Sequence, residues 1–275
     1  SPSKIIPFSR YNIDLLFIFL KKTITNLWNN YNRLKYSMAL RKFQNFLKNI
    51  ESDIFRINYY PNSDLKSYHL KYWLTFIVNL YLKFYHRVDV TNPEYIPKLG
   101  AGVIASNHMS HLDGIIINAV TAYHTRRKIN FLAAEDVYNK NFLFRFLCDL
   151  GNTIPVQRST SDRVALLKVI KLLKKDNLVG LFPEGQRSRD GKIGEGKMGV
   201  AIMALKTGTP IIPLAINGTF QAFPRKTKMI KPEKVKLKFG SPLKFSIEKK
   251  PDKKRIEDVT KQIMNEIKKL YNDIN

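Results

Sequence analysis

Residues 102–120 read GVIASNHMSHLDGIIINAV, and this stretch decides the fold. Residues 102–106 form a short apolar run of the length of a buried strand, and the apolar residues from Gly114 onward are long enough for a helix. Polar side chains fill the turn between the two. A strand that passes directly into a helix is the repeating unit of an α/β domain.

The same alternation continues toward the C-terminus. Short apolar runs predict strands at 102–106, 129–133, 153–156, 178–182, 211–217 and 235–239. Segments between and after them predict helices near 114–123, 141–150, 161–174, 197–206 and 254–271. We therefore predict an α/β fold with a mixed, mostly parallel sheet flanked by helices and preceded by an N-terminal helical segment.

The N-terminal quarter differs in composition from the rest. Residues 1–68 are rich in Asn, Lys, Tyr and Phe, and we predict a helical extension there and a main domain over 69–275. A helix at about 70–86 carries Trp73, Phe76, Leu80 and Phe84 beside basic residues, which suits the head-group boundary of a bilayer. Packing of this helix on the core is the other interpretation. No apolar run reaches the length of about 20 residues that a membrane span needs, and no cleavable signal peptide is evident.

Charge limits the classes of partner. The chain has 47 Lys and Arg against 22 Asp and Glu, a formal net charge of +25. Such a chain favours polyanions: nucleic acid, anionic lipid or phosphorylated substrates. A solvated Lys-rich surface is the simpler explanation. One cysteine, Cys148, excludes an internal disulfide and indicates a reducing compartment.

His108 and Asp113 lie in the turn after the first predicted strand, where α/β proteins place their ligand sites. The spacing lets the carboxylate reach one imidazole nitrogen and leaves the other as a general base. Many proteins contain such a spacing by chance, so a structural turn histidine is the competing interpretation. His108 and His111 lack a nearby acidic or cysteine cluster, and we expect no metal.

Two further segments follow predicted strands. Residues 182–191 read FPEGQRSRDG, where Arg187 can offer a planar fork to a phosphate and Ser188 an extra donor. Glu184 can orient that arginine, and backbone groups near Gly185 or His108 can meet an oxyanion. Arg158 precedes a predicted helix whose N-terminus can add anion donors. Charged surface loops are the alternative for each segment.

Together these segments resemble the glycerolipid acyltransferase family. Residues 107–113 resemble the family's Asn-His-x-Ser-x-x-Asp block. Residues 182–188 resemble its Phe-Pro-Glu-Gly-Thr-Arg-Ser block, with Gln186 in place of Thr. Arg158 resembles its arginine block, and residues 212–214 resemble its proline block. The resemblance covers about residues 70–245, with the blocks in the family's order. Bacterial members often carry a lysine where this chain has Glu135 or Asp136, and only Lys140 lies nearby.

The resemblance implies acyl transfer from a thioester to the free hydroxyl of lysophosphatidic acid. His108 is then the base and Asp113 its orienting partner, while Arg158, Glu184, Gly185, Arg187 and Ser188 bind the acceptor phosphate. It implies no cofactor, with acyl-CoA or acyl carrier protein as co-substrate. We expect a protein at the cytoplasmic face of an anionic membrane, peripheral or monotopic, that binds no nucleic acid. Glycerol 3-phosphate or another lyso-lipid as acceptor, a thioester or phosphoester hydrolase, and a non-catalytic basic lipid- or nucleic-acid-binding protein are the alternatives.

Overall fold

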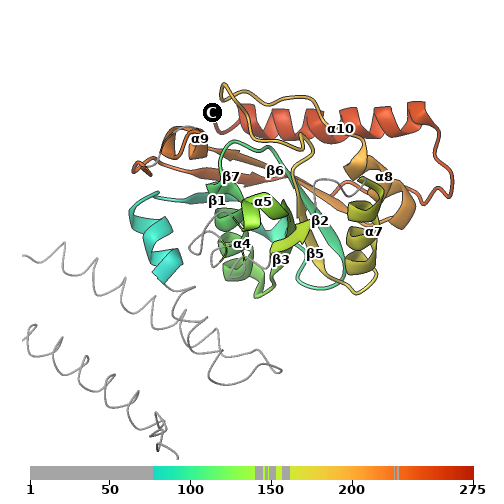
Figure 1. The fold of residues 1–275 in the computed structure, drawn as a ribbon, viewed down its shortest axis with the longest axis horizontal. Helices are drawn as coiled ribbons and strands as arrows, with labels where there is room; N and C mark the ends of the chain where they lie inside the picture. Colours follow the sequence, from blue (N-terminus) through green and yellow to red (C-terminus); the bar gives the residue numbers. More distant parts are fainter. Residues whose placement is uncertain are drawn as a thin grey trace, which may run out of the picture. The chain divides into compact units, whose positions relative to one another are not determined.

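One mixed sheet organises the part of the chain that the computed structural model describes, residues 77–139, 145, 148, 153–156, 162–225, 227 and 229–275. In this part the strand order is β1-β7-β6-β2-β5-β3-β4 (Figure 1). The strands are β1 Asp89–Thr91, β2 Gly102–Ser106, β3 Ile129–Ala134, β4 Thr153–Val156, β5 Leu178–Leu181, β6 Ile211–Asn217 and β7 Lys236–Phe239. Strands from β6 through β4 are mutually parallel, whereas β7 pairs antiparallel with β6 and parallel with β1.

The central strands are apolar because both faces of the sheet are covered. Every residue of β2 is buried, as expected for a parallel strand with helices on both sides. In β5, a Cβ on Gly180 would overlap the ring of Phe131 from the neighbouring β3. Glycine at this position therefore lets the aromatic ring lie across the strand.

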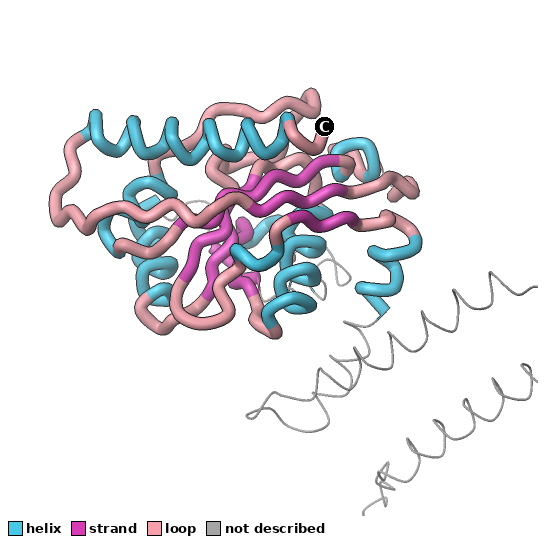
Figure 2. Tube along the Cα trace, turned by 180° about the vertical axis from the view of Figure 1, so that it is seen from behind, coloured by secondary structure: helices cyan, strands magenta, loops and turns pink. Residues whose placement is uncertain are grey.

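Helices form a layer on each side of the sheet (Figures 1 and 2). The helices are α4 Leu112–Thr125, α5 Glu135–Tyr138, α7 Asp162–Leu173, α8 Gly199–Thr207, α9 Thr219–Ala222 and α10 Lys253–Asn272, with a 3-10 turn at Pro93–Tyr95. One core cluster joins α4 to the sheet through Ile104, Ile116 and Ile117. A second joins α7, α8 and α10 to the other face, where Val103 packs with Ile263. The sheet thus separates two hydrophobic cores.

The long helix α10 is amphipathic and capped. The side chain of Asp252 accepts a hydrogen bond from the Arg255 N–H at 2.6 Å, which satisfies a free donor of the first turn. Its buried residues recur at helical spacing: Val259, Thr260, Ile263, Met264, Ile267 and Leu270. No helix among the described residues is long and apolar enough to cross a membrane.

The predicted fold class is confirmed, and the differences from the predicted elements are local. The strand predicted at 235–239 begins one residue later, α4 begins at Leu112 rather than 114, and β1, α5 and α9 were not predicted because each is very short. Residues 77–84 are helical and residues 85–86 form a turn and a bend, so the helix predicted at 70–86 ends two residues early. Residues 70–76 of that prediction and most of the helix predicted at 141–150 lie outside the described residues. All described residues belong to the unit Asn62–Asn275, and the boundary at 68 stays a prediction.

Candidate active site

Two loops meet at one edge of the sheet because the strands before them are neighbours. β2 and β5 pair in parallel with Ala105 opposite Leu181, so residues 107–111 and 182–191 leave the same edge side by side. We call them the β2 loop and the β5 loop. The Ser188 N–H donates to the His108 carbonyl at 2.8 Å and joins the two loops directly.

The β2 loop holds an imidazole against a buried carboxylate. His108 Nδ1 lies 2.8 Å from Asp113 Oδ2, and the same oxygen accepts the N–H groups of Met109 at 2.6 Å and Ser110 at 2.8 Å. Asp113 is fully buried at the start of α4. Because an ionised carboxylate only accepts, Nδ1 carries the proton and Nε2 is the basic nitrogen. No described residue bonds Nε2.

Stacking fixes the plane of the His108 ring. Its centroid lies 3.8 Å from that of Phe182 with an interplanar angle of 11°, and Phe182 stacks in turn on Phe131 at 5.5 Å. The bond to Asp113 fixes the rotation within that plane. The side chain is 18% exposed, so the ring is held rigidly while one edge still reaches solvent.

Polar contacts with residues far along the chain anchor the β2 loop. The Asn107 amide donates to the Ile216 carbonyl and accepts the Ile216 N–H, both at 2.8 Å, which attaches the loop to β6. Ser110 Oγ donates to the Phe223 carbonyl at 2.9 Å. Sequence reasoning missed both roles, although an Asn and a Ser inside a candidate site loop are a signal for side-chain bonds to the backbone.

Glu184 of the β5 loop braces the β2 loop. Its Oε1 accepts the His108 N–H and its Oε2 the Gly194 N–H, each at 2.8 Å, and the residue is buried. Gly185 has φ +67, a left-handed conformation that favours glycine, and its N–H donates to the Phe182 carbonyl at 2.9 Å. The backbone N–H groups of His108 and Gly185 are therefore both occupied and are not open to an oxyanion.

Arg187 and Ser188 complete the β5 loop. Burial lowers the pKa of the half-buried Arg187 guanidinium, the charge of Arg225 lowers it further, and the charge of Asp113 opposes both. Ser188 Oγ accepts the Gly191 N–H at 2.9 Å and contacts Asp190 Oδ1 at 3.2 Å. Arg187 thus lies near enough to Asp113 for their charges to interact, while the Ser188 hydroxyl bonds within the turn.

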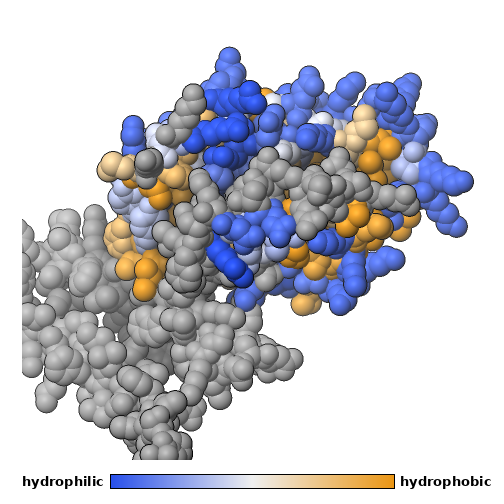
Figure 3. Space-filling view, in the orientation of Figure 1, coloured by the Kyte–Doolittle hydropathy of each residue, from blue (hydrophilic) through white to orange (hydrophobic). Residues whose placement is uncertain are grey.

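The remaining candidate residues are distributed as follows. Arg158, Lys140, Trp73 and Phe76 lie outside the described residues. Leu80 is half-buried, whereas Phe84 is 59% exposed on a face shared with Ile77 and Tyr81 (Figure 3). Within the described residues, no group of three or more His, Cys, Asp or Glu is arranged to hold a metal ion.

The segment that carries both loops is similar in sequence to known proteins. A family model described as Acyltransferase matches residues 87–217, which include both loops. A 1-acyl-sn-glycerol-3-phosphate acyltransferase of Borreliella burgdorferi is 33% identical over 138 residues, 50% of this chain and 54% of that protein. One from Bacillus subtilis is 28% identical over 190 residues, 68% of this chain and 89% of that protein.

Residues 87–217 thus match an acyltransferase model, and the chain resembles the glycerolipid acyltransferase family. The predicted resemblance is confirmed. A crystal structure of the 1-acyl-sn-glycerophosphate acyltransferase PlsC from Thermotoga maritima has the same fold, with a TM-score of 0.56 and 23% identity, and the match covers 80% of this chain and 87% of that one. In this chain, Arg225 and α10 lie beyond the segment that the family model matches. The chain spans about half the length of the Borreliella relative.

Proposed function

We propose that this protein transfers a fatty acyl group from an acyl thioester to the free hydroxyl of lysophosphatidic acid. The bond of 2.8 Å between His108 Nδ1 and the buried Asp113 carries the proposal, because it leaves Nε2 as a base at the sheet edge. The names of the family relatives support this acceptor. Glycerol 3-phosphate and other lyso-lipids fit the same chemistry and serve as comparison acceptors in the test.

In the proposed reaction, Nε2 of His108 accepts the proton of the acceptor hydroxyl as its oxygen attacks the thioester carbonyl carbon. Asp113 holds the ring in the required tautomer and faces the positive charge that forms on it. The C–S bond then breaks, the thiolate leaves, and the proton on Nε2 passes to the sulfur. No acyl-enzyme is needed, since the acceptor oxygen attacks the donor directly.

The acceptor phosphate is proposed to bind at the guanidinium of Arg187. A guanidinium matches phosphate geometry with two parallel hydrogen bonds. Arg158 stays a predicted second ligand. The backbone N–H groups of Gly185 and Ser188 bond the Phe182 and His108 carbonyls, so phosphate contacts through these donors are not part of the proposal. Glu184 enters this scheme differently from its sequence-based assignment, because a carboxylate that braces His108 acts on the base rather than on an anion.

The donor is proposed to be acyl-CoA or acyl carrier protein, with no other cofactor. The exposed face of Ile77, Tyr81 and Phe84, together with the high positive charge, supports binding to an anionic membrane surface. Trp73 and Phe76 are predicted to extend this face. We propose peripheral or monotopic association at the cytoplasmic side.

A transfer assay with lysophosphatidic acid and labelled acyl-CoA on mixed anionic vesicles tests the function. We expect phosphatidic acid from the wild-type chain, with less product from glycerol 3-phosphate. His108→Ala should lower kcat about 10²- to 10⁴-fold, the range that general base catalysis typically contributes. His111→Ala, in the same loop, is the matched control and should retain most of the activity. Near-normal turnover by His108→Ala, with product identity verified, would refute the assignment.

A further inference from the structure

We propose that Arg225, outside the segment matched by the family model, is a further acceptor-binding residue that binds the phosphate together with Arg187 and selects phosphate monoesters. The inference rests on the proposed function, because it names a further ligand of the same acceptor. It is carried by the position of the chain around Arg225, by the charges at the site, and by the lack of a carboxylate partner.

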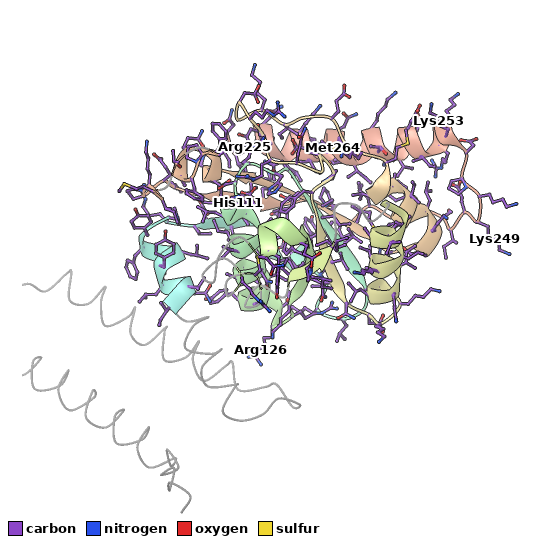
Figure 4. The ribbon with its side chains drawn as sticks, viewed as in Figure 1. His111, Arg126, Arg225, Lys249, Lys253 and Met264 are labelled. Atoms are coloured by element: carbon purple, nitrogen blue, oxygen red, sulfur yellow. The ribbon has the colours of Figure 1, made fainter. Side chains whose placement is uncertain are left out.

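Backbone contacts bring Arg225 to the site. The Phe223 carbonyl, two residues before it, accepts the Ser110 hydroxyl of the β2 loop at 2.9 Å. Arg187 is likewise one residue from Ser188, whose N–H bonds the His108 carbonyl at 2.8 Å. Each arginine therefore lies one or two residues along the chain from a residue that bonds directly to the segment 108–110. Arg225 and His111 follow parallel neighbouring strands, β6 and β2, and lie at the same end of the sheet (Figure 4).

The segment that carries Arg225 is itself fixed. The Lys231 N–H donates to the Ala222 carbonyl at 2.8 Å, and the Thr227 N–H to the Pro224 carbonyl at 3.2 Å, which closes the loop around Arg225. On its other side, a Cβ at Gly191 would lie 3.2 Å from the Phe220 ring, so α9 packs on the β5 loop. The position of Arg225 is thus coupled to both site loops.

The two guanidinium groups lie close enough to repel each other. The charge of Arg225 lowers the pKa of Arg187, after the larger effect of burial. Among the described residues, neither arginine forms an ion pair with a carboxylate within 4.0 Å. The charge of Asp113 offsets part of that of Arg187, but its Oδ2 already has three hydrogen-bond partners. Two neighbouring cations therefore favour a further anion between them, and each charge-assisted bond to phosphate relieves the repulsion.

A pair of guanidinium groups discriminates between head groups by charge. A phosphate monoester carries nearly two negative charges at neutral pH, with a second pKa near 6, whereas a phosphodiester carries one. Lysophosphatidic acid and glycerol 3-phosphate are monoesters, while lysophosphatidylcholine is a diester with a cationic head group. Removal of Arg225 should therefore weaken monoester binding selectively.

The test measures binding and turnover in the chain of 275 residues. Calorimetry measures the Kd of glycerol 3-phosphate, short-chain lysophosphatidic acid and short-chain lysophosphatidylcholine for wild type, Arg225→Gln, Arg225→Lys and Arg126→Gln. Arg126, an exposed arginine at the C-terminus of α4 and so at the opposite end of the sheet, is the matched charge control (Figure 4). We expect Arg225→Gln to raise the monoester Kd and acceptor KM about tenfold, equal to about 1.4 kcal/mol. Arg225→Lys should recover part of the loss, and the donor KM should stay within twofold.

Because binding and turnover are measured separately, a failure of this inference can be distinguished from a failure of the proposed function. Equal Kd values for Arg225→Gln and Arg126→Gln would overturn the role of Arg225, whatever the turnover. A selective loss of monoester binding in Arg225→Gln would support it, even if the wild-type chain transferred no acyl group. A parallel loss of lysophosphatidylcholine binding would also overturn it, because the effect would then not depend on the second phosphate charge.

Discussion

The two loops of the site differ in how their polar groups are used. In the β2 loop, Asn107, Ser110 and Asp113 are buried, and their side chains bond to backbone or to His108. In the β5 loop, Glu184 and Ser188 are buried, while Gly185, Gln186 and Arg189 are exposed and Arg187 is half-buried. The first loop is held by many bonds to the fold, and the second presents the half-buried Arg187 and the exposed Arg189. We infer that the β2 loop sets the geometry of the base and the β5 loop receives the substrate.

The largest effect should come from breaking the β2 loop at its carboxylate. In Asp113→Asn the amide can donate to Nδ1, which leaves Nε2 protonated and no longer a base. We expect kcat to fall about 10³- to 10⁴-fold with the acceptor KM changed less than threefold, as measured by steady-state transfer. Asp258→Asn, at an exposed position of α10, is the control and should be neutral. Retained kcat in a folded Asp113→Asn would show that the carboxylate does not orient the base.

A smaller effect should follow from removing the brace between the loops. In Glu184→Gln an amide N–H₂ faces either the His108 or the Gly194 N–H, which then lacks an acceptor. The unpaired donor should lower the free energy of unfolding by about 1–3 kcal/mol. Displacement of His108 should lower kcat about 10- to 100-fold. The acceptor KM should stay close to that of wild type, measured beside exposed Glu195→Gln. A rise in acceptor KM without a fall in kcat would instead support the sequence-based phosphate role of Glu184.

The smallest expected effect is a loss of folding stability at acid pH. Measuring this loss shows whether a fall in activity with pH comes from the β2 loop or from unfolding. Burial lowers the pKa of His86, which bonds Tyr81 Oη and the Glu233 carbonyl, each at 3.2 Å. Since its folded pKa lies below the unfolded value of about 6.5, the unfolded chain binds the proton more readily. Stability should be complete above pH 6.5 and decrease as the pH falls below it.

His86→Gln keeps a donor and an acceptor but cannot titrate in this range. We expect its Tm to decrease less than that of wild type between pH 7.5 and 5.5 in calorimetric scans. His124→Gln is the comparison variant, because burial also lowers the pKa of His124. If Tm decreased by the same amount in all three proteins, the titration of His86 would not contribute to the loss of stability at acid pH. Activity lost at a pH where Tm is unchanged can then be assigned to the site.

Much of the sheet was predictable because strand formation depends on local patterns. The central strands β2 and β6 were predicted with their observed bounds, since they are apolar runs bounded by polar or turn residues. β1 was not, because three residues with alternating exposure carry almost no signal. Pro213 has no N–H to donate, so its presence argues against a central strand. It is nevertheless part of β6, and its carbonyl accepts the Gly240 N–H just beyond the end of β7.

The spacing of residues a few positions apart predicted the alternating strands and helices, the positions of His108 and Asp113 in one turn, and the resemblance to the acyltransferase family. Contacts between distant residues could not be predicted in this way. Glu184 bonds His108 across 76 residues, Asn107 pairs with β6 across 109, and the Phe223 carbonyl accepts the Ser110 hydroxyl across 113. The pairing order of the strands creates these contacts, and no local pattern encodes which loops that order brings together.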